Sequence, residues 1–248
     1  LGGDALWRLI SQEKKARRRI VSIAENYRKV EENIQQACRT AGRSRDEVRL
    51  IAVTKFVDTD RIGEAADAGA KEVGENRPQE LVSKLDFFQK RGLCPHMIGQ
   101  LQTNKVKYVI GKVALIQSVD RPELAKEISR LAQKHGCSQD VLLEVNIGAE
   151  EQKGGVMPAA LPGFLDMVSQ LPGIRVKGLM CIPPNVGQEE ARRYFAQMRT
   201  LFDRLVSAGW KEMDTLSMGM SGDYIAAILE GATMVRVGTA IFGPRQTA

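Results

Sequence analysis

Eight short apolar segments, each paired with an amphipathic helical pattern, constrain the fold of this chain more than any other feature. The two patterns alternate from residue 49 onward, with tight connections that often hold glycine or proline. The pattern predicts strands at 49–55, 71–76, 95–99, 115–120, 141–148, 174–182, 215–220 and 234–243. It predicts helices at 59–69, 78–91, 103–110, 122–135, 158–171, 188–208 and 222–230. Such alternation is typical of α/β proteins with a parallel sheet.

Eight consecutive units in a chain of 248 residues predict a single (β/α)8 barrel, whose usual length is about 250 residues. A doubly wound open sheet would also alternate, but the unbroken order favours closure. Helical spacing over residues 5–42 predicts an additional N-terminal helix, or a broken pair, outside the barrel or across its bottom. We expect residues 1–19 to be an extension and 20–248 to form the barrel domain, with no C-terminal β-domain.

Composition excludes several classes of protein. With 43% hydrophobic and 27% charged residues, the chain can bury a substantial core. The net charge of +6 is concentrated in residues 14–19, where basic residues crowd together. Acidic residues follow (Glu25, Glu31, Glu32) and no aromatic residues interrupt the basic run. This indicates a solvated helix face rather than a surface for nucleic acid or membrane.

Metal and redox sites are not indicated either. The cysteines, Cys38, Cys94, Cys137 and Cys181, form no CxxC pair, and the chain holds only two histidines, so a zinc site is not expected. The sequence shows no apolar stretch of membrane-spanning length and no signal-like segment. We therefore expect a soluble, cytoplasmic protein.

Lys55 stands where the first strand should end, after the apolar run Leu50 to Val53. In a barrel, functional groups lie where strands end and loops begin. Partial burial at that place lowers the pKa of an amine and frees it to attack a carbonyl. The simpler alternative is a lysine that reaches from the rim of the sheet into solvent.

The same rule selects polar groups after the other strands. They are Glu75, Asn76, His96, Asn146, Ser217, Ser221, Arg236 and Thr239, together with Met180. Asn76 could instead cap the following helix, and His96 could be a buried histidine of the core. The methionines Met180, Met218 and Met220 are typical of packing.

Strands seven and eight end in small residues that suit a phosphate site. Gly219, Ser221, Gly222, Gly238 and Thr239 follow them, and loops at this place in barrels commonly bind phosphate through backbone amides and hydroxyls. Ser217 and Thr239 can each donate a hydroxyl. Arg236 lies in an apolar run and needs a partner, which could be a bound anion, a pyridine nitrogen or a protein carboxylate.

Six motifs carry a family resemblance that extends from about residue 20 to 243. They are AVTK (52–55), GEN (74–76), HMIGQLQTNK (96–105), GLMCIPP (178–184), LSMGMSGD (216–223) and VRVGTAIFG (235–243). With them the chain resembles the pyridoxal phosphate homeostasis protein family, single barrels related to alanine racemase. The chain departs from the family pattern at Arg77 and Pro95, where an aromatic residue is frequent.

The resemblance implies the cofactor and the residues that hold it. It implies that Lys55 forms a Schiff base with pyridoxal 5′-phosphate (PLP) and that Asn76 lies near its ring. It places Ser217, Gly238 and Thr239 on the phosphate side and Arg236 beside the cofactor. It also marks Lys153, which could assist PLP transfer as a second amine or be an ordinary loop residue.

Three functions compete on these residues. The first is a non-catalytic PLP carrier in PLP homeostasis, which would deliver PLP to apo-enzymes and would be a monomer without the β-domain of racemases. The second is a PLP-dependent racemase or decarboxylase, although racemisation needs an acid or base on each face of the substrate. Tyr27, Tyr108, Tyr194 and Tyr224 all lie in expected helices, and only Tyr224 could reach the rim. The third is a PLP-free aldolase that uses Lys55. We favour the carrier.

Overall fold

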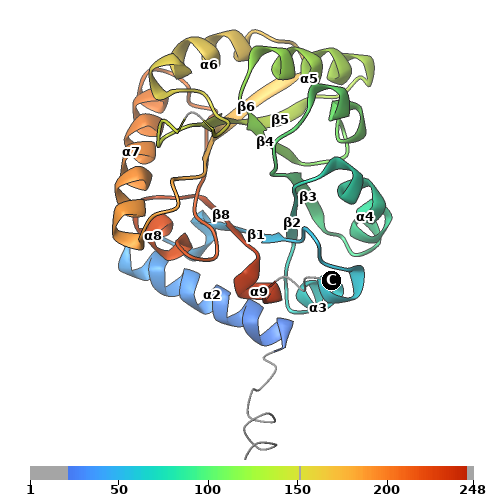
Figure 1. Ribbon diagram of the computed structural model, residues 1–248, viewed down its shortest axis with the longest axis vertical. Coiled ribbons are helices and arrows are strands. Elements are labelled where there is room, and N and C mark those ends of the chain that lie inside the picture. The colour runs from blue at the N-terminus through green and yellow to red at the C-terminus, as the bar shows by residue number, and fades with distance from the viewer. Residues whose placement is uncertain (1–21, 151, 245–248) are drawn as a thin grey trace, which may run out of the picture.

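The computed structural model describes residues 22–150 and 152–244 and forms a closed parallel barrel (Figure 1). The strands follow one another around the barrel in chain order, and β8 pairs with β1. They are β1 (Arg49–Val53), β2 (Glu72–Glu75), β3 (Cys94–Met97), β4 (Leu115–Val119), β5 (Gln139–Val145), β6 (Ile174–Cys181), β7 (Thr215–Ser217) and β8 (Met234–Val237). The single (β/α)8 barrel predicted from the alternation is confirmed.

Helices surround the barrel, as Figure 1 shows. The α-helices are α2 (Ile23–Thr40), α3 (Thr59–Asp67), α4 (Pro78–Lys90), α5 (Pro122–Lys134), α6 (Leu161–Ser169), α7 (Gln188–Ser207), α8 (Tyr224–Leu229) and α9 (Thr239–Phe242). Short 3-10 turns are η1 (Arg45–Glu47), η2 (Thr103–Tyr108) and η3 (Pro158–Ala160). The helix expected at 103–110 is therefore the 3-10 turn η2, and the one expected at 158–171 is η3 followed by α6.

The additional N-terminal helix lies on the side of the barrel and not across its bottom. α2 begins after a capping box formed by Ser22 and Glu25, and the part predicted before it, with the extension 1–19, lies outside the described residues. α2 packs against α8 and α9 (Figure 1), where Asn26 Nδ2 donates to the Ile241 carbonyl at 3.0 Å. Within the described residues α9 is the one helix after β8, and α2 completes the ring of outer helices.

The eighth strand is shorter than predicted. The expectation was a strand to residue 243, but β8 ends at Val237 and the next residues form α9. The carbonyl of Gly238 accepts the amides of Ile241 and Phe242, which closes a helical turn. A short apolar run does not distinguish a strand from one helical turn. The seventh strand likewise ends at Ser217 and not at 220.

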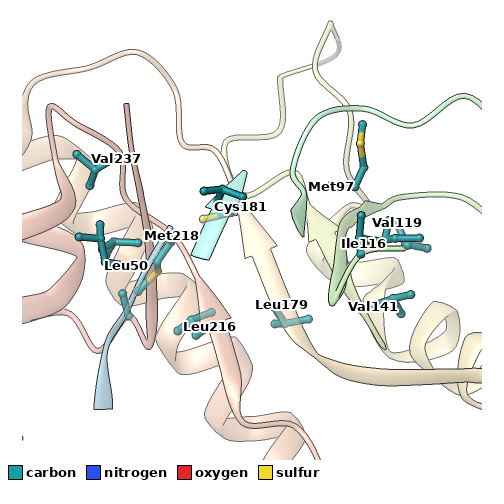
Figure 2. Close-up of a cluster of buried hydrophobic side chains, with 14 of the residues drawn as sticks. Leu50, Met97, Ile116, Val119, Val141, Leu179, Cys181, Leu216, Met218 and Val237 are labelled. Atoms are coloured by element: carbon teal, nitrogen blue, oxygen red, sulfur yellow. The ribbon is translucent and has the colours of Figure 1, made fainter. Parts of the chain in front are cut away.

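Alternation along each strand separates an outer core from the barrel interior. Figure 2 shows the outer core, in which Leu50, Leu179, Leu216 and other side chains pack between the sheet and the helices. The interior holds a separate apolar group: Ile51, Leu115, Leu142, Met180 and Met234. Other inward positions are polar and buried: His96, Gln117, Ser217 and Arg236. Arg236 also lines the site described next, and the other three lie below it.

Candidate functional site

A pocket of about 440 Å³ opens at the carboxyl ends of the strands, and we call it the barrel pocket. Five of the six residues proposed from the sequence line it: Lys55, Asn76, Arg236, Gly238 and Thr239. They lie on β8 or directly after β1, β2 and β8, which are neighbours in the barrel. Functional groups gather at this end of a barrel, and these residues lie together there as the sequence predicted.

Lys55 points into the pocket because of the period of β1. Ile51 belongs to the interior group and Val53 and Lys55 both line the pocket, as expected of alternate residues in an extended chain. Lys55 itself lies in a turn closed by the Val57 amide and the Thr54 carbonyl. The residues on either side are held by α4: Lys84 Nζ donates to the Thr54 carbonyl, and Glu80 accepts the Phe56 amide.

Arg236 is a buried cation with neutral partners. Its side chain comes from β8 and is 3% exposed. Nη1 donates to Ser217 Oγ at 2.6 Å, and Nη2 donates to the Cys181 carbonyl at 2.9 Å. Among the described residues, no carboxylate forms an ion pair with it. Burial lowers the pKa of Arg236. Of the partners considered from the sequence, a protein carboxylate is therefore not the one in this structure.

Ser217 lies beneath the pocket and not on its wall. It is fully buried, and its hydroxyl donates to Gln117 Oε1 at 2.7 Å while it accepts from Arg236. The pocket residue on this side is Ser221, four residues later in the loop after β7. Because β7 ends at Ser217, its alternation turns this side chain into the barrel rather than out at the mouth.

Ser221 marks a place where two backbone amides converge. Its Oγ accepts the amides of Gly238 at 3.0 Å and Ala240 at 3.3 Å. A Cβ on Gly238 would stand 3.3 Å from Val53 Cβ, so a side chain there would crowd the pocket wall. Ser221 therefore satisfies these amides, and its hydroxyl lines the pocket beside Gly238 and Thr239, where an anionic oxygen would meet two hydroxyls.

Asn76 faces the pocket and does not cap a helix. The N-cap of α4 is Arg77, which makes no side-chain capping bond, so the capping alternative for Asn76 is wrong. A Cβ on Gly99 would lie 2.4 Å from the Asn76 carbonyl oxygen. The chain after β3 therefore packs directly on the backbone that presents Asn76, and only glycine fits there.

Other rim candidates have structural partners instead. His96 is fully buried in the barrel interior, 3.0 Å from Glu72 and 3.3 Å from Gln117. Asn146 bonds both backbone groups of Glu150, which closes its own loop. Glu75 is buried and paired with Lys84 at 2.8 Å. None of these three lines the barrel pocket; Met180 is buried in the barrel interior, and Met220 lines the pocket.

Two charged residues join the pocket from β5 and the loop that follows it. Glu144 lies on β5, and Lys153 lines the pocket with Nζ 3.1 Å from the Pro183 carbonyl and 2.5 Å from Glu150. Burial, reinforced by the nearby Asp120 and opposed by Arg236, raises the pKa of Glu144 to about 7. The sequence analysis missed Glu144 because it stands within an apolar strand rather than at its end. The sequence feature that could have identified Glu144 is that it is a single carboxylate within the apolar segment VLLEVNIG (141–148).

Glu144→Gln should change how stability depends on pH. The folded protein binds the Glu144 proton more tightly than the unfolded chain, whose pKa is near 4.5. The proton therefore contributes stability below pH 4.5 that is lost as pH rises toward 7. We expect the glutamine variant to gain about 2–3 kcal/mol relative to the original protein between pH 4.5 and 8. Urea unfolding of both proteins at pH 4.5 and pH 8 measures this. If the two proteins differ in stability by the same amount at both pH values, the expectation is contradicted.

Tyrosine is absent from the described lining of the pocket. Tyr224, the one with a chance to reach the rim, is 5% exposed and its hydroxyl accepts from Asn33 Nδ2 on α2 at 2.9 Å. Among the described residues there is also no cluster of acidic, histidine and cysteine side chains that could hold a metal. None of the described helices combines the length and apolarity that a bilayer crossing requires.

Comparison with known proteins agrees with this geometry. The family described as the alanine racemase N-terminal domain matches residues 26–246. The pyridoxal phosphate homeostasis protein of Aquifex aeolicus is 45% identical over 227 residues, which cover 91% of this chain and all of that protein.

Solved structures show the same barrel. The PipY protein of Synechococcus elongatus, solved with PLP bound, is 38% identical with a TM-score of 0.73; the match covers 79% of this chain and 93% of that one. Alanine racemase of Clostridium difficile is only 16% identical, with a TM-score of 0.67, and the match covers 90% of this chain and 58% of the racemase. That likeness shows the fold alone. As its motifs indicated, the chain belongs to the pyridoxal phosphate homeostasis protein family, which is built on the alanine racemase barrel.

Proposed function

We propose that this protein is a non-catalytic PLP carrier, which holds PLP as a Schiff base on Lys55 and serves PLP homeostasis in the cytoplasm. The observation that supports this most is the convergence of Lys55 and Arg236 on one pocket with Ser221, Gly238 and Thr239. The names of its relatives and the PLP in the Synechococcus elongatus protein support the same cofactor.

The residues present fit the chemical groups of PLP. Lys55 supplies the amine for the aldehyde. The hydroxyls of Ser221 and Thr239, beside Gly238, suit the phosphate. Arg236 and Asn76 remain for the ring. If Arg236 faces the pyridine nitrogen, its permanent charge disfavours protonation there, which weakens the ring as an electron sink. That property suits storage better than catalysis.

One observation favours an alternative, a PLP-dependent amino-acid enzyme on the same barrel. Glu144 has a pKa of about 7 and stands on β5, which lies across the closed barrel from β1, the strand before Lys55. Two such groups resemble the acid and base that racemisation requires. The carrier proposal predicts that the PLP-loaded protein turns over no amino acid. Turnover that Glu144→Gln abolishes would support the enzyme instead.

The Schiff base is tested by absorbance with added PLP, before and after borohydride reduction. We expect a visible band in the original protein and none in Lys55→Ala, with the reduced adduct on the peptide that holds Lys55. Lys153→Ala is the matched control, because Lys153 also lines the pocket, and its band should persist. If the original protein shows no band, the PLP proposal fails and an aldolase for phosphorylated sugars becomes the hypothesis.

Delivery to apo-enzymes is the second part of the proposal. Lys153 is tethered by Glu150 and Pro183 at the pocket mouth, where a second amine can compete with Lys55 for the aldehyde. We expect Lys153→Ala to slow PLP transfer from the loaded protein to an apo-enzyme severalfold. The rate at which the recipient gains activity measures this, and an unchanged rate would exclude the role. The carrier is also proposed to be a monomer, and light scattering tests this by measuring its molecular mass in solution.

A further inference from the structure

A chain of buried polar groups crosses the interior of the barrel and ends at the pocket. Glu72 on β2 lies 3.0 Å from His96 Nε2, and His96 Nδ1 lies 3.3 Å from Gln117 Nε2. Gln117 Oε1 accepts from Ser217 at 2.7 Å, and Ser217 accepts from Arg236 at 2.6 Å. His96, Gln117 and Ser217 are fully buried. Of the five residues, Arg236 is the one that lines the barrel pocket.

The chemistry of these groups fixes one direction for every hydrogen bond. A guanidinium only donates, so the hydroxyl of Ser217 accepts from Arg236. Its own proton is donated to Gln117 Oε1. Gln117 then presents its oxygen to Ser217 and its NH₂ to His96. Since an amide NH₂ cannot accept, His96 Nδ1 is the acceptor and carries no proton. The ring proton is on Nε2, which lies 3.0 Å from a carboxylate oxygen of Glu72 in an electrostatic contact rather than an aligned hydrogen bond.

Glu72, at the end of the polar chain away from the pocket, is held in place by a charged partner. The guanidinium of Arg49 donates to both oxygens of Glu72, at 2.9 and 2.7 Å. The contact with His96 and these bonds from Arg49 together hold the pKa of Glu72 down at about 2 against its burial. Burial lowers the pKa of His96, which agrees with a neutral ring. A fixed carboxylate therefore orients the histidine, and each later group inherits its orientation from the one before.

We propose that His96 and Gln117 are positioning residues for the cofactor pocket. Anchored on Glu72, they keep the hydroxyl of Ser217 turned as an acceptor and so hold the guanidinium of Arg236 toward the ligand. The inference rests on the proposed PLP function. It assigns a role to inward residues of β3 and β4 that do not line the barrel pocket.

A merely structural role explains these residues less well. The same barrel fills its neighbouring inward positions with Ile51, Leu115, Leu142, Met180 and Met234. Buried polar groups rarely stabilise a core better than apolar side chains of similar size. An interior of this kind gains no stability from a polar chain, so we infer that the chain serves the end that lines the pocket. That end is Arg236, whose contacts to the protein are Ser217 and the Cys181 carbonyl.

The direction of the hydrogen bonds along this chain of polar groups is tested on the protein without PLP. The sequence contains only two histidines, His96 and the exposed His135, so ¹⁵N NMR of the His135→Gln variant reports His96 alone. We expect a neutral ring with its proton on Nε2 at pH 7. A proton on Nδ1, or a charged ring, would overturn the inference whatever the protein binds.

The effect on the pocket is tested with two matched variants, Gln117→Met and Gln139→Met. Gln139 is also buried in a strand and bonded, through Gly111 and Val113, but it lies away from the pocket. Both variants lose a buried amide, so both should unfold more easily. Only Gln117→Met should release PLP faster, by about tenfold, the usual effect of disturbing a hydrogen bond from a charged donor.

Each result has one meaning. Faster PLP release in Gln117→Met alone supports the positioning role. Equal release rates in both variants and the original protein would overturn it, and so would equal acceleration in both. If the original protein does not bind PLP, the proposed function fails, while the His96 measurement still decides whether the chain has the inferred direction.

Discussion

Lys84→Met should be among the most destabilising substitutions in this protein, lowering the free energy of unfolding by about 3–5 kcal/mol. Lys84 is 7% exposed, and its amine contacts Glu75 at 2.8 Å, Glu80 at 2.9 Å and the Thr54 carbonyl at 2.9 Å. Glu75 is fully buried, and its Oε1 also accepts from the Thr54 hydroxyl. Without the amine, a buried carboxylate loses its cation. Urea unfolding measures the loss.

Two controls separate burial from a general effect of losing a lysine. Lys90→Met makes the same change on the same helix, but at an exposed position, and should stay within about 0.5 kcal/mol. The double variant Glu75→Gln, Lys84→Met should be more stable than Lys84→Met, because the fully buried carboxylate is then neutral, while Glu80 is partly exposed and still accepts the Phe56 amide. A double variant less stable than Lys84→Met would contradict this account.

The same cluster links stability to function. Lys84 and Glu80 bond the residues on either side of Lys55, so α4 fixes the turn that presents the proposed Schiff-base lysine. Burial raises the pKa of Glu75, and contact with Lys84 opposes that rise. The sequence analysis placed Glu75 at the rim as a functional candidate. In the structure it does not line the pocket, and it bonds Lys84 and the hydroxyl of Thr54, the residue before Lys55.

The sequence predicted the fold well because two signals agreed. Alternating strand and helix patterns gave the number and order of units, and glycine or proline marked most ends, as at Pro78 and Pro122. Closure followed from eight unbroken units. The pattern failed where local preference is weak: the apolar residues 239–242 suit a strand or a helical turn equally, and the Gly238 carbonyl decides between them.

Site residues were predictable where the inward–outward alternation of a strand continues beyond its last residue. Lys55, Asn76 and Gly238 each continue the inward face of their strand into the pocket. Ser217 and Ser221 were harder, because the choice depends on where β7 ends, and strand ends are poorly marked in sequence. The partners of Arg236 were not predictable, because they come from β6 and β7, far away along the chain.

Arg236→Met should stabilise the protein without PLP while it weakens PLP binding. The guanidinium is buried against neutral acceptors, Ser217 and the Cys181 carbonyl, and has no ion pair among the described residues. An apolar side chain of similar length avoids the cost of burying this charge, so unfolding of the PLP-free variant should require about 1–3 kcal/mol more. PLP should bind at least about tenfold more weakly, since a charged hydrogen-bond donor is lost.

Arg236→Lys separates charge from geometry in the same two measurements. Lysine keeps the charge but cannot place two donors in a fixed fork, so it should show weaker PLP binding without the gain in stability. Unfolding of the PLP-free proteins and titration with PLP give both quantities. If Arg236→Met is less stable than the original, the arginine serves the fold itself, and the polar chain behind it stabilises the barrel rather than preparing it for a ligand. A gain in stability with a loss of binding would mean that the protein keeps a costly buried charge for its cofactor, as expected where function opposes stability.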